Sequence, residues 1–143
     1  MTNGGAMELA ATGDAAGIFC VMSNELGTPK ILLCELDKNH SAATNFTPDF
    51  DSSKISYFVG LNAVPNQPQM ILSGDDNFAI DGVPVKSGLL EFTTNAPIAW
   101  TTARHINAGN IGLADGSVQS VTTDGLQKLI QRSGVATNRL AIP

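Results

Sequence analysis

Short β-rich runs follow one another closely through the middle of the chain, and this spacing constrains the fold more than any other feature. Gly, Pro, Asn and Asp residues separate the runs and mark turns between them. Parallel strands need crossover connections of about a dozen residues or more, so these short connections favour an antiparallel sheet. The candidate strands cover residues 55–60, 69–75, 78–80, 83–85, 89–93 and 98–101.

A β-hairpin is predicted at residues 109–121, near the C-terminus. Ile111 and Leu113 alternate with small or polar neighbours, as expected for a strand with one buried face. Asp115-Gly116 then supplies the turn, because a tight primed turn needs two residues that tolerate positive φ.

Two helices flank the strands. Apolar residues in 14–26 recur at the helical period, which predicts one buried stripe, and Gly27 and Pro29 end the pattern. Residues 123–133 form a second, shorter helix that Gly134 ends. The N-terminal stripe comprises Ala15, Ile18, Phe19, Met22 and Leu26.

These elements predict an α+β fold in a single domain, residues 1–143. The N-terminal helix packs on an antiparallel β-sheet, and a hairpin and a short helix close the chain. The apolar run 31–34 is interpreted as a further short strand, and residues 35–53 as a polar loop. The tail after residue 134 shows no pattern that predicts an element.

Composition excludes some classes of function. The 143 residues include only 15% charged residues, and the formal net charge is −5. The eight Lys and Arg residues are scattered, so we expect no nucleic-acid binding, which needs clustered positive charge. No stretch is apolar for long enough to span a membrane, and no signal peptide is visible. The polar start at residues 1–6 is expected to be flexible.

The two cysteines, Cys20 and Cys34, leave two alternatives open. They form a disulfide if the chain is exported, or they remain buried thiols that pack as small hydrophobic residues. The second alternative is favoured because free cysteines are commonly buried. A metal site built on these two thiolates alone is not expected.

No constellation in the sequence predicts an enzyme. Of the two histidines, His40 lies in a polar loop and is expected to be solvated. His105 is either a general base or a structural residue that fixes a turn by bonding the backbone or a carboxylate such as Asp115. The structural role is favoured, because geometry rather than residue type makes a base.

An acidic cluster gives a weak calcium hypothesis. Asp75, Asp76, Asn77 and Asp81 place several oxygens close together in the sequence, as hard cations require. Their spacing matches no helix-loop-helix calcium loop, and Asp and Asn are frequent in plain turns. We therefore expect no cofactor, with calcium as the weaker alternative.

One segment resembles a known family. His105, nine intervening residues and Asp115-Gly116 resemble the H-x(9)-D-G motif at the C-terminus of prepilin-like proteins from planctomycetes, verrucomicrobia and related bacteria. Further stretches resemble the soluble domain of such proteins, namely residues 19–34, 56–60 and 68–75.

The resemblance implies a non-enzymatic structural subunit of a type IV pilin-like or general-secretion pseudopilin-like protein. Members of the family begin with a basic leader, a cleavage and methylation site and a long apolar helix that anchors them in the inner membrane. This sequence shows none of these, so we expect it to be the periplasmic or extracellular head of a truncated protein. Its partners would be other pilin-like subunits or secretion components, and its only membrane contact would be through the missing anchor.

Within that family the H-x(9)-D-G element has no assigned catalytic role, so the resemblance transfers no catalytic residue to this chain. His105, Asp115 and Gly116 would instead hold the C-terminal hairpin. Two alternatives stay open beside it: an extracytoplasmic ligand- or metal-binding module using loops 35–53 and 74–82, and a hydrolase with His105 as base.

Overall fold

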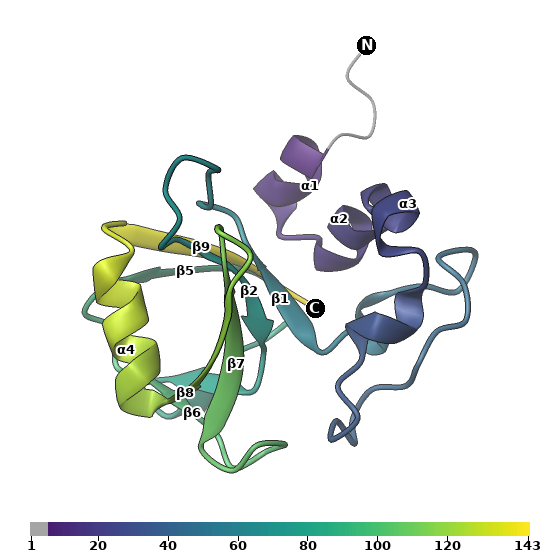
Figure 1. Cartoon of the computed structure of the whole chain (residues 1–143). Coiled ribbons are helices and arrows are strands. Elements are labelled where there is room, and N and C mark those ends of the chain that lie inside the picture. The colour runs from purple at the N-terminus through teal and green to yellow at the C-terminus, as the bar shows by residue number, and fades with distance from the viewer. Residues whose placement is uncertain (1–5) are drawn as a thin grey trace.

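A computed structural model describes residues 6–143 and has the predicted α+β architecture (Figure 1). Short helices begin the chain, two antiparallel sheets form its body, and a helix and a strand close it. The start of the chain that was expected to be flexible lies, except for Ala6, outside the described residues.

The larger sheet has six strands in the order β5-β9-β1-β2-β7-β8, and the smaller has three in the order β4-β3-β6. Every pairing is antiparallel, as the short connections predict. The larger sheet comprises β1 (Tyr57–Gly60), β2 (Ile71–Asp75), β5 (Gly88–Thr93), β7 (Ala108–Leu113), β8 (Val118–Thr122) and β9 (Thr137–Ile142). The smaller sheet comprises β3 (Phe78–Ile80), β4 (Val83–Pro84) and β6 (Ile98–Trp100).

The main core lies between the larger sheet, the smaller sheet and α4 (Thr123–Arg132). Phe78 stacks edge-on against both Phe58 and Trp100, with ring centroids 5.8 and 6.2 Å apart. Helix α4 contributes Leu126, Leu129 and Ile130, the apolar face that the sequence predicts.

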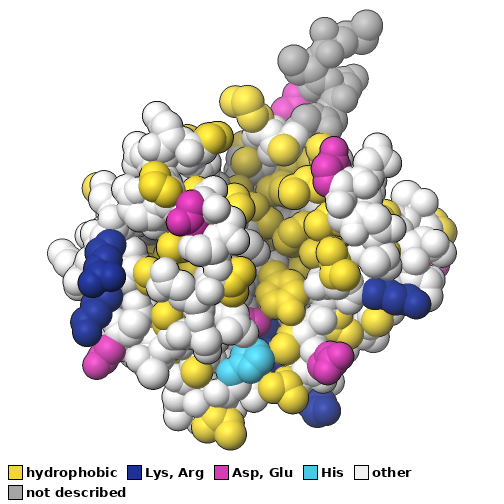
Figure 2. Space-filling view, viewed as in Figure 1, with side chains coloured by type: hydrophobic (Ala, Val, Ile, Leu, Met, Phe, Trp, Pro, Cys, Tyr) yellow, Lys and Arg dark blue, Asp and Glu magenta, His cyan; other side chains and the backbone are white. Residues whose placement is uncertain are grey.

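The N-terminal helices cover part of the opposite face of the larger sheet. They are α1 (Ala6–Thr12), α2 (Ala15–Val21) and α3 (Ser23–Leu26). Ala15 and Ile18 of α2 cluster with Ala141 of β9, whereas the neighbouring Leu140 and Ile142 belong to the main core. Successive side chains on a strand point to opposite faces, so α2 packs on the sheet from the far side. Figure 2 shows apolar side chains gathered in the hollow between these helices and the strands.

The predicted helix over residues 14–26 is interrupted. Helix α2 ends at Val21, and α3 begins at Ser23. Met22 lies between them with φ −91° and ψ 12°. Its N–H donates to Phe19 O, three residues earlier, at 3.1 Å, so the last turn of α2 has the hydrogen bond of a 3₁₀ helix.

The strand predicted at 31–34 is wrong, and the tail, for which no element was predicted, forms a strand. Residues 31–32 of the expected strand belong instead to a 3₁₀ helix, η1 (Pro29–Leu32), because Pro29 presets its φ and the Thr28 hydroxyl caps Lys30 N–H at 3.3 Å. Leu33 and Cys34 follow this helix without joining a sheet. The tail after residue 134 forms β9, which pairs with β5 on one side and β1 on the other. Leu140, Ala141 and Ile142 are all buried, so this strand has no polar alternation to reveal it. A second 3₁₀ turn, η2 (Ser52–Lys54), ends the long loop.

The hairpin of β7 and β8 is confirmed, but its turn differs from the predicted type. Only Gly116 has positive φ, at 86°, and its N–H bonds Leu113 O at 2.9 Å. Leu113 N–H in turn bonds Ser117 O, which is the pattern of a type I turn followed by a glycine bulge. The primed Asp-Gly turn occurs instead at Asp81 (φ 51°) and Gly82 (φ 74°), between β3 and β4.

Substitution of Gly116 tests this turn. No atom lies within 4 Å of the position a Cβ would take, so the cost of a side chain is conformational and not steric. We expect Gly116→Val to lower the free energy of unfolding by roughly 1 kcal/mol or more, because a β-branched residue disfavours the left-handed region. Gly116→Asn is the control, since Asn tolerates that region. Equal losses for Val and Asn in chemical denaturation would contradict the assignment.

Candidate functional site

The loop between β6 and β7, residues 101–107, carries the two residues around which the site is built, Arg104 and His105. Asn77 holds both ends of this loop. Its amide donates to Ala103 O at 3.0 Å and to Ala108 O at 3.3 Å, and its backbone carbonyl accepts from Thr101 N–H at 2.9 Å.

The backbone of this loop is held in a rarely populated conformation. Arg104, Ile106 and Asn107 have φ values of 59°, 51° and 59°. Positive φ is unfavourable for a β-branched residue such as Ile106, and such geometry persists only where surrounding contacts over-determine it. Those contacts come from the side chains of Arg104 and His105, which point into the body of the protein.

Arg104 forms a buried network with three chain segments. Its side chain is 7% exposed, and its guanidinium lies 2.7 Å from Asp37 Oδ2 and in contact with Asp76 Oδ1. Nη1 also donates to Ser56 O at 2.9 Å. A planar fork of N–H donors suits this arrangement, because one cation serves two carboxylates and a carbonyl.

Asp37 accepts more hydrogen bonds than any simple turn requires. Its side chain is 0% exposed, and Oδ2 receives the Ser56 hydroxyl at 2.7 Å and lies 2.6 Å from His40 Nδ1. Oδ1 accepts from the N–H groups of Asn39 at 2.9 Å and His40 at 3.3 Å. Burial alone would raise the pKa of Asp37, but these hydrogen bonds and the charge of Arg104 outweigh it and lower the pKa to about 2.

The neighbouring carboxyl behaves in the opposite way. For Asp76, burial is the largest influence and raises the pKa to about 6, against the opposing charge of Arg104. The two carboxylates that share one guanidinium therefore titrate in different pH ranges.

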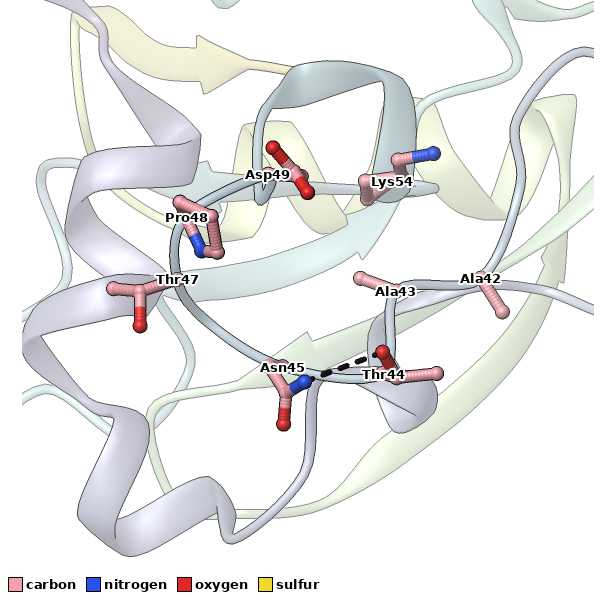
Figure 3. Close-up of a pocket in the computed structure, with 8 residues that line it drawn as sticks. All are labelled: Ala42, Ala43, Thr44, Asn45, Thr47, Pro48, Asp49 and Lys54. Atoms are coloured by element: carbon pink, nitrogen blue, oxygen red, sulfur yellow. Dashed lines mark hydrogen bonds between the residues drawn. The ribbon is translucent and has the colours of Figure 1, made fainter.

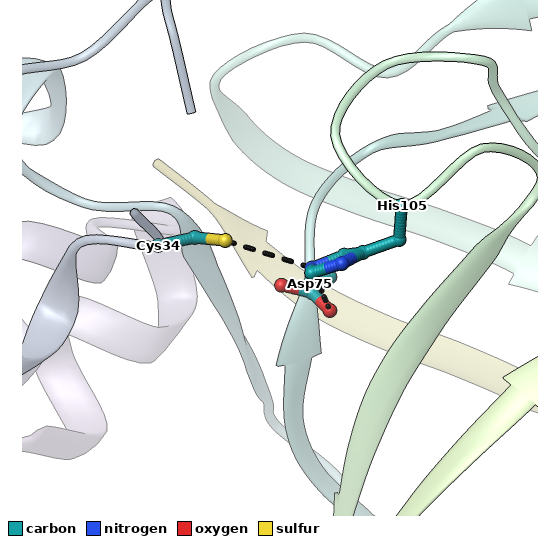
Figure 4. Close-up of side chains that lie close together, drawn as sticks. All are labelled: Cys34, Asp75 and His105. Atoms are coloured by element: carbon teal, nitrogen blue, oxygen red, sulfur yellow. Dashed lines mark hydrogen bonds and ion pairs between the residues drawn. The ribbon is translucent and has the colours of Figure 1, made fainter. Parts of the chain in front are cut away.

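Beside this network, Cys34, Asp75 and His105 meet from three distant segments (Figure 4). Cys34 follows η1, Asp75 ends β2, and His105 lies in the loop before β7. His105 Nε2 is 3.5 Å from Cys34 Sγ and 3.4 Å from Asp75 Oδ2. Cys34 and Asp75 are buried, and the His105 side chain is 23% exposed.

The connectivity of this cluster argues against nucleophilic catalysis. In a catalytic relay the nucleophile and the carboxylate bond to different ring nitrogens of the histidine. Here Cys34 and Asp75 both approach Nε2, so the carboxylate cannot orient the ring toward the thiol in that way. The arrangement is instead that of three ligand atoms converging on one point.

Tyr57 is influenced by the same cluster. Its backbone pairs with Asp75 across β1 and β2. Burial raises the pKa of Tyr57 to about 12, and the nearby groups Cys34 and Asp75 add to the effect.

The residues of the H-x(9)-D-G motif do not form one contact group. His105 faces Asp75 and Cys34, whereas the Asp115 carboxylate accepts the Ser117 N–H at 2.9 Å and the Ser117 hydroxyl at 2.6 Å. Those bonds lower the pKa of Asp115. Gly116 occupies the positive-φ turn position. His40, expected to be solvated, is half-buried against Asp37.

The acidic residues proposed for calcium point to different places. Asp75 faces His105 and Asn110, Asp76 pairs with Arg104, and the Asn77 amide spans the loop. Asp81 is exposed in the β3–β4 turn. Successive side chains on extended backbone point to opposite sides, so residues that are close in the sequence do not bring their oxygen atoms together around one ion.

The predicted ligand-binding loop 35–53 encloses part of an open cavity of about 200 Å³ (Figure 3). Cys and His side chains do not line it, and Lys54 donates to the Ser41 hydroxyl at 2.7 Å. The charged side chains that line it are those of Asp49 and Lys54. Its lining residues are Ala42, Ala43, Thr44, Asn45, Thr47, Pro48, Asp49 and Lys54.

Both cysteines are free thiols in the structure. Cys34 is buried, as the favoured alternative predicts, whereas Cys20 is partly exposed and its Sγ lies 3.7 Å from Phe46 O. Burial and the charge of Asp14 raise the pKa of the Cys20 thiol, so Cys20 is not an activated nucleophile.

Comparisons of the chain with protein-family models, curated proteins and solved structures return no match. No helix among residues 6–143 combines the length and the apolar character that crossing a bilayer requires. The family resemblance therefore stays a prediction.

Sequence analysis does not single out Cys34, Asp37 or Arg104 as site residues. Arg104 precedes His105 directly, and Cys34 closes an apolar run, but neither pattern says which segments meet. Cys34 and His105 are 71 positions apart, and only the tertiary fold joins them.

Removal of the Arg104 guanidinium tests the network. We expect Arg104→Ala to lower the free energy of unfolding by about 3–5 kcal/mol, because it leaves two buried carboxylates without their partner. Arg139→Ala is the matched control: Arg139 pairs with Glu91 at 3.1 Å, but both side chains are exposed, so about 0–1 kcal/mol is expected. Similar losses in urea denaturation would contradict a structural role for Arg104.

The free energy of unfolding at acid pH tests the lowered pKa of Asp37. Because its folded pKa of about 2 lies below the ordinary 3.8, its contribution is complete above pH ~4 and is lost as the pH falls toward ~2. Asp37→Asn should therefore flatten the pH dependence of unfolding in that window. Asp76→Asn, whose parent carboxyl titrates at about 6, should leave that slope intact. An unchanged slope in Asp37→Asn would contradict the assignment.

Proposed function

We propose that this chain is a non-enzymatic structural subunit, the head of a type IV pilin-like or general-secretion pseudopilin-like protein. In this proposal it acts by assembly into a filament or secretion complex and lies on the periplasmic or extracellular side of the inner membrane. Other pilin-like subunits or secretion components are its partners.

The observation that carries the proposal is the placement of the N-terminal helices. Helix α2 packs Ala15 and Ile18 on the outer face of β1 and β9, while α1 ahead of it buries no residue and exposes 89% of Met7. Leu9 of α1 packs against the same cluster, so the apolar side chain that α1 leaves available for contact with another chain is Met7. A helix placed before an antiparallel head is also what the family resemblance implies.

The distribution of charge supports the same proposal. Arg104, Asp37 and Asp76 form internal ion pairs that join segments of the fold. These buried ion pairs thus hold the segments of the domain in one arrangement. A subunit that assembles into a filament or complex needs such a defined shape.

The gene upstream of the codon for Met1 provides the first test. We expect a basic leader followed by ~20 apolar residues, long enough to cross a bilayer, and a mature N-terminus that mass spectrometry finds methylated. A translation start at Met1 without such a segment would remove the basis for a filament subunit.

A paired substitution then tests assembly. In the full-length protein, Met7→Glu should reduce incorporation into filaments or the secretion complex while the circular dichroism of the head stays unchanged, because Met7 is exposed. Gln131→Glu adds the same charge at an exposed position of α4 and should have no effect. Equal incorporation of both variants would count against α1 as an assembly surface.

A further inference from the structure

We propose that Cys34, Asp75 and His105 bind one divalent transition-metal ion of the zinc class. The sulfur, nitrogen and oxygen atoms that these side chains offer all lie within 4.8 Å of one another (Figure 4). Within residues 6–143 this is the group of Cys, His and acidic side chains whose ligand atoms converge in this way. The inference does not depend on the function proposed above.

Two of the three separations between ligand atoms suit a tetrahedral ion. Zinc binds Cys sulfur at about 2.3 Å and His nitrogen or carboxylate oxygen at about 2.0–2.2 Å, which places neighbouring ligand atoms about 3.3–3.6 Å apart. The separation of His105 Nε2 from Cys34 Sγ is 3.5 Å, and from Asp75 Oδ2 it is 3.4 Å. Both separations are edges of such a tetrahedron.

The state of the Asp75 carboxylate is an independent indication. Asp75 is 1% exposed, and its Oδ1 atom has no hydrogen-bond partner among residues 6–143. A buried carboxylate oxygen without a partner is costly, and a cation bound by both oxygens of Asp75 would offset that cost. Asn110 orients the group by donating its N–H and its side-chain amide to Oδ2, at 2.7 and 3.2 Å, as second-shell donors do in metal sites.

The donor set selects the class of ion. A thiolate and an imidazole favour zinc and its neighbours in the transition series, whereas calcium and magnesium prefer oxygen ligands. The site thus differs from the calcium hypothesis, and it shares only Asp75 with it. Three protein ligands leave a fourth position for water or another ligand, on the side where His105 is partly exposed.

Such an ion would cross-link three segments that hydrogen bonds already bring together: the segment after η1, strand β2 and the loop before β7. Since the ligands are not close in the unfolded chain, binding would stabilise the fold by linkage. A rise in melting temperature with zinc is therefore an expected signature.

Titration with Co²⁺ and then Zn²⁺ tests the site. The chain is purified with a reductant, treated with a chelator and dialysed. We expect one equivalent of Co²⁺ to bind with thiolate-to-cobalt charge-transfer absorption, and Zn²⁺ to displace it. Cys34→Ser and His105→Gln should weaken binding by about 100-fold or more, since even second-shell changes cost 10–100-fold. Cys20→Ser is the matched control and should bind as the parent does.

Absence of stoichiometric binding, or equal binding by Cys34→Ser and the parent, would overturn the proposal. So would loss of binding in Cys20→Ser, which would place the ion at the other thiol. X-ray absorption of the zinc-loaded parent needs no variant and guards against misfolded mutants. One sulfur at about 2.3 Å with nitrogen and oxygen neighbours supports the site, whereas no sulfur or two sulfurs contradicts it.

Discussion

Three segments of the chain meet at one buried side chain, the guanidinium of Arg104. The Arg104 guanidinium joins Asp37 from the long loop, Asp76 from the end of β2 and the Ser56 carbonyl ahead of β1. Charges removed from water are tolerated only when they are paired and their hydrogen bonds are satisfied, so this group admits few alternative arrangements. It therefore ties the loop that contains Asp37 to the end of β2 and to the loop before β7.

The same contact explains the shape of the loop before β7. The backbone adopts positive φ at Arg104, Ile106 and Asn107, and Asn77 holds both ends of the loop. With Arg104 anchored in this way, the next residue, His105, is directed at Cys34 and Asp75. The anchoring of Arg104 thus helps to place the His105 imidazole beside the other two residues of the proposed metal site.

The surface of the protein carries few charges, because several charged side chains are buried in the ion pairs. Only 15% of the residues are charged, several of them are used inside, and apolar side chains lie in the hollow between the N-terminal helices and the strands (Figure 2). A domain with buried ion pairs between its segments and few charges on its surface suits repeated contact with neighbouring subunits. This supports the proposal of an assembling head and is independent of the question of metal binding.

The sequence by itself determined the elements whose signals are local. The spacing of the β-rich runs predicted antiparallel pairing, and the apolar face of α4 and the hairpin around Gly116 followed from residues a few positions apart. Strand β9 escaped detection because its last three residues are all apolar and buried, without the alternation that marks a strand. Residues 31–32 joined a 3₁₀ helix through the flanking Pro29 and Thr28. The meeting of Cys34 with His105, and of Asp37 with Arg104, was decided by tertiary structure alone, because burial and ion pairing act between segments whose separation along the chain carries no local signal.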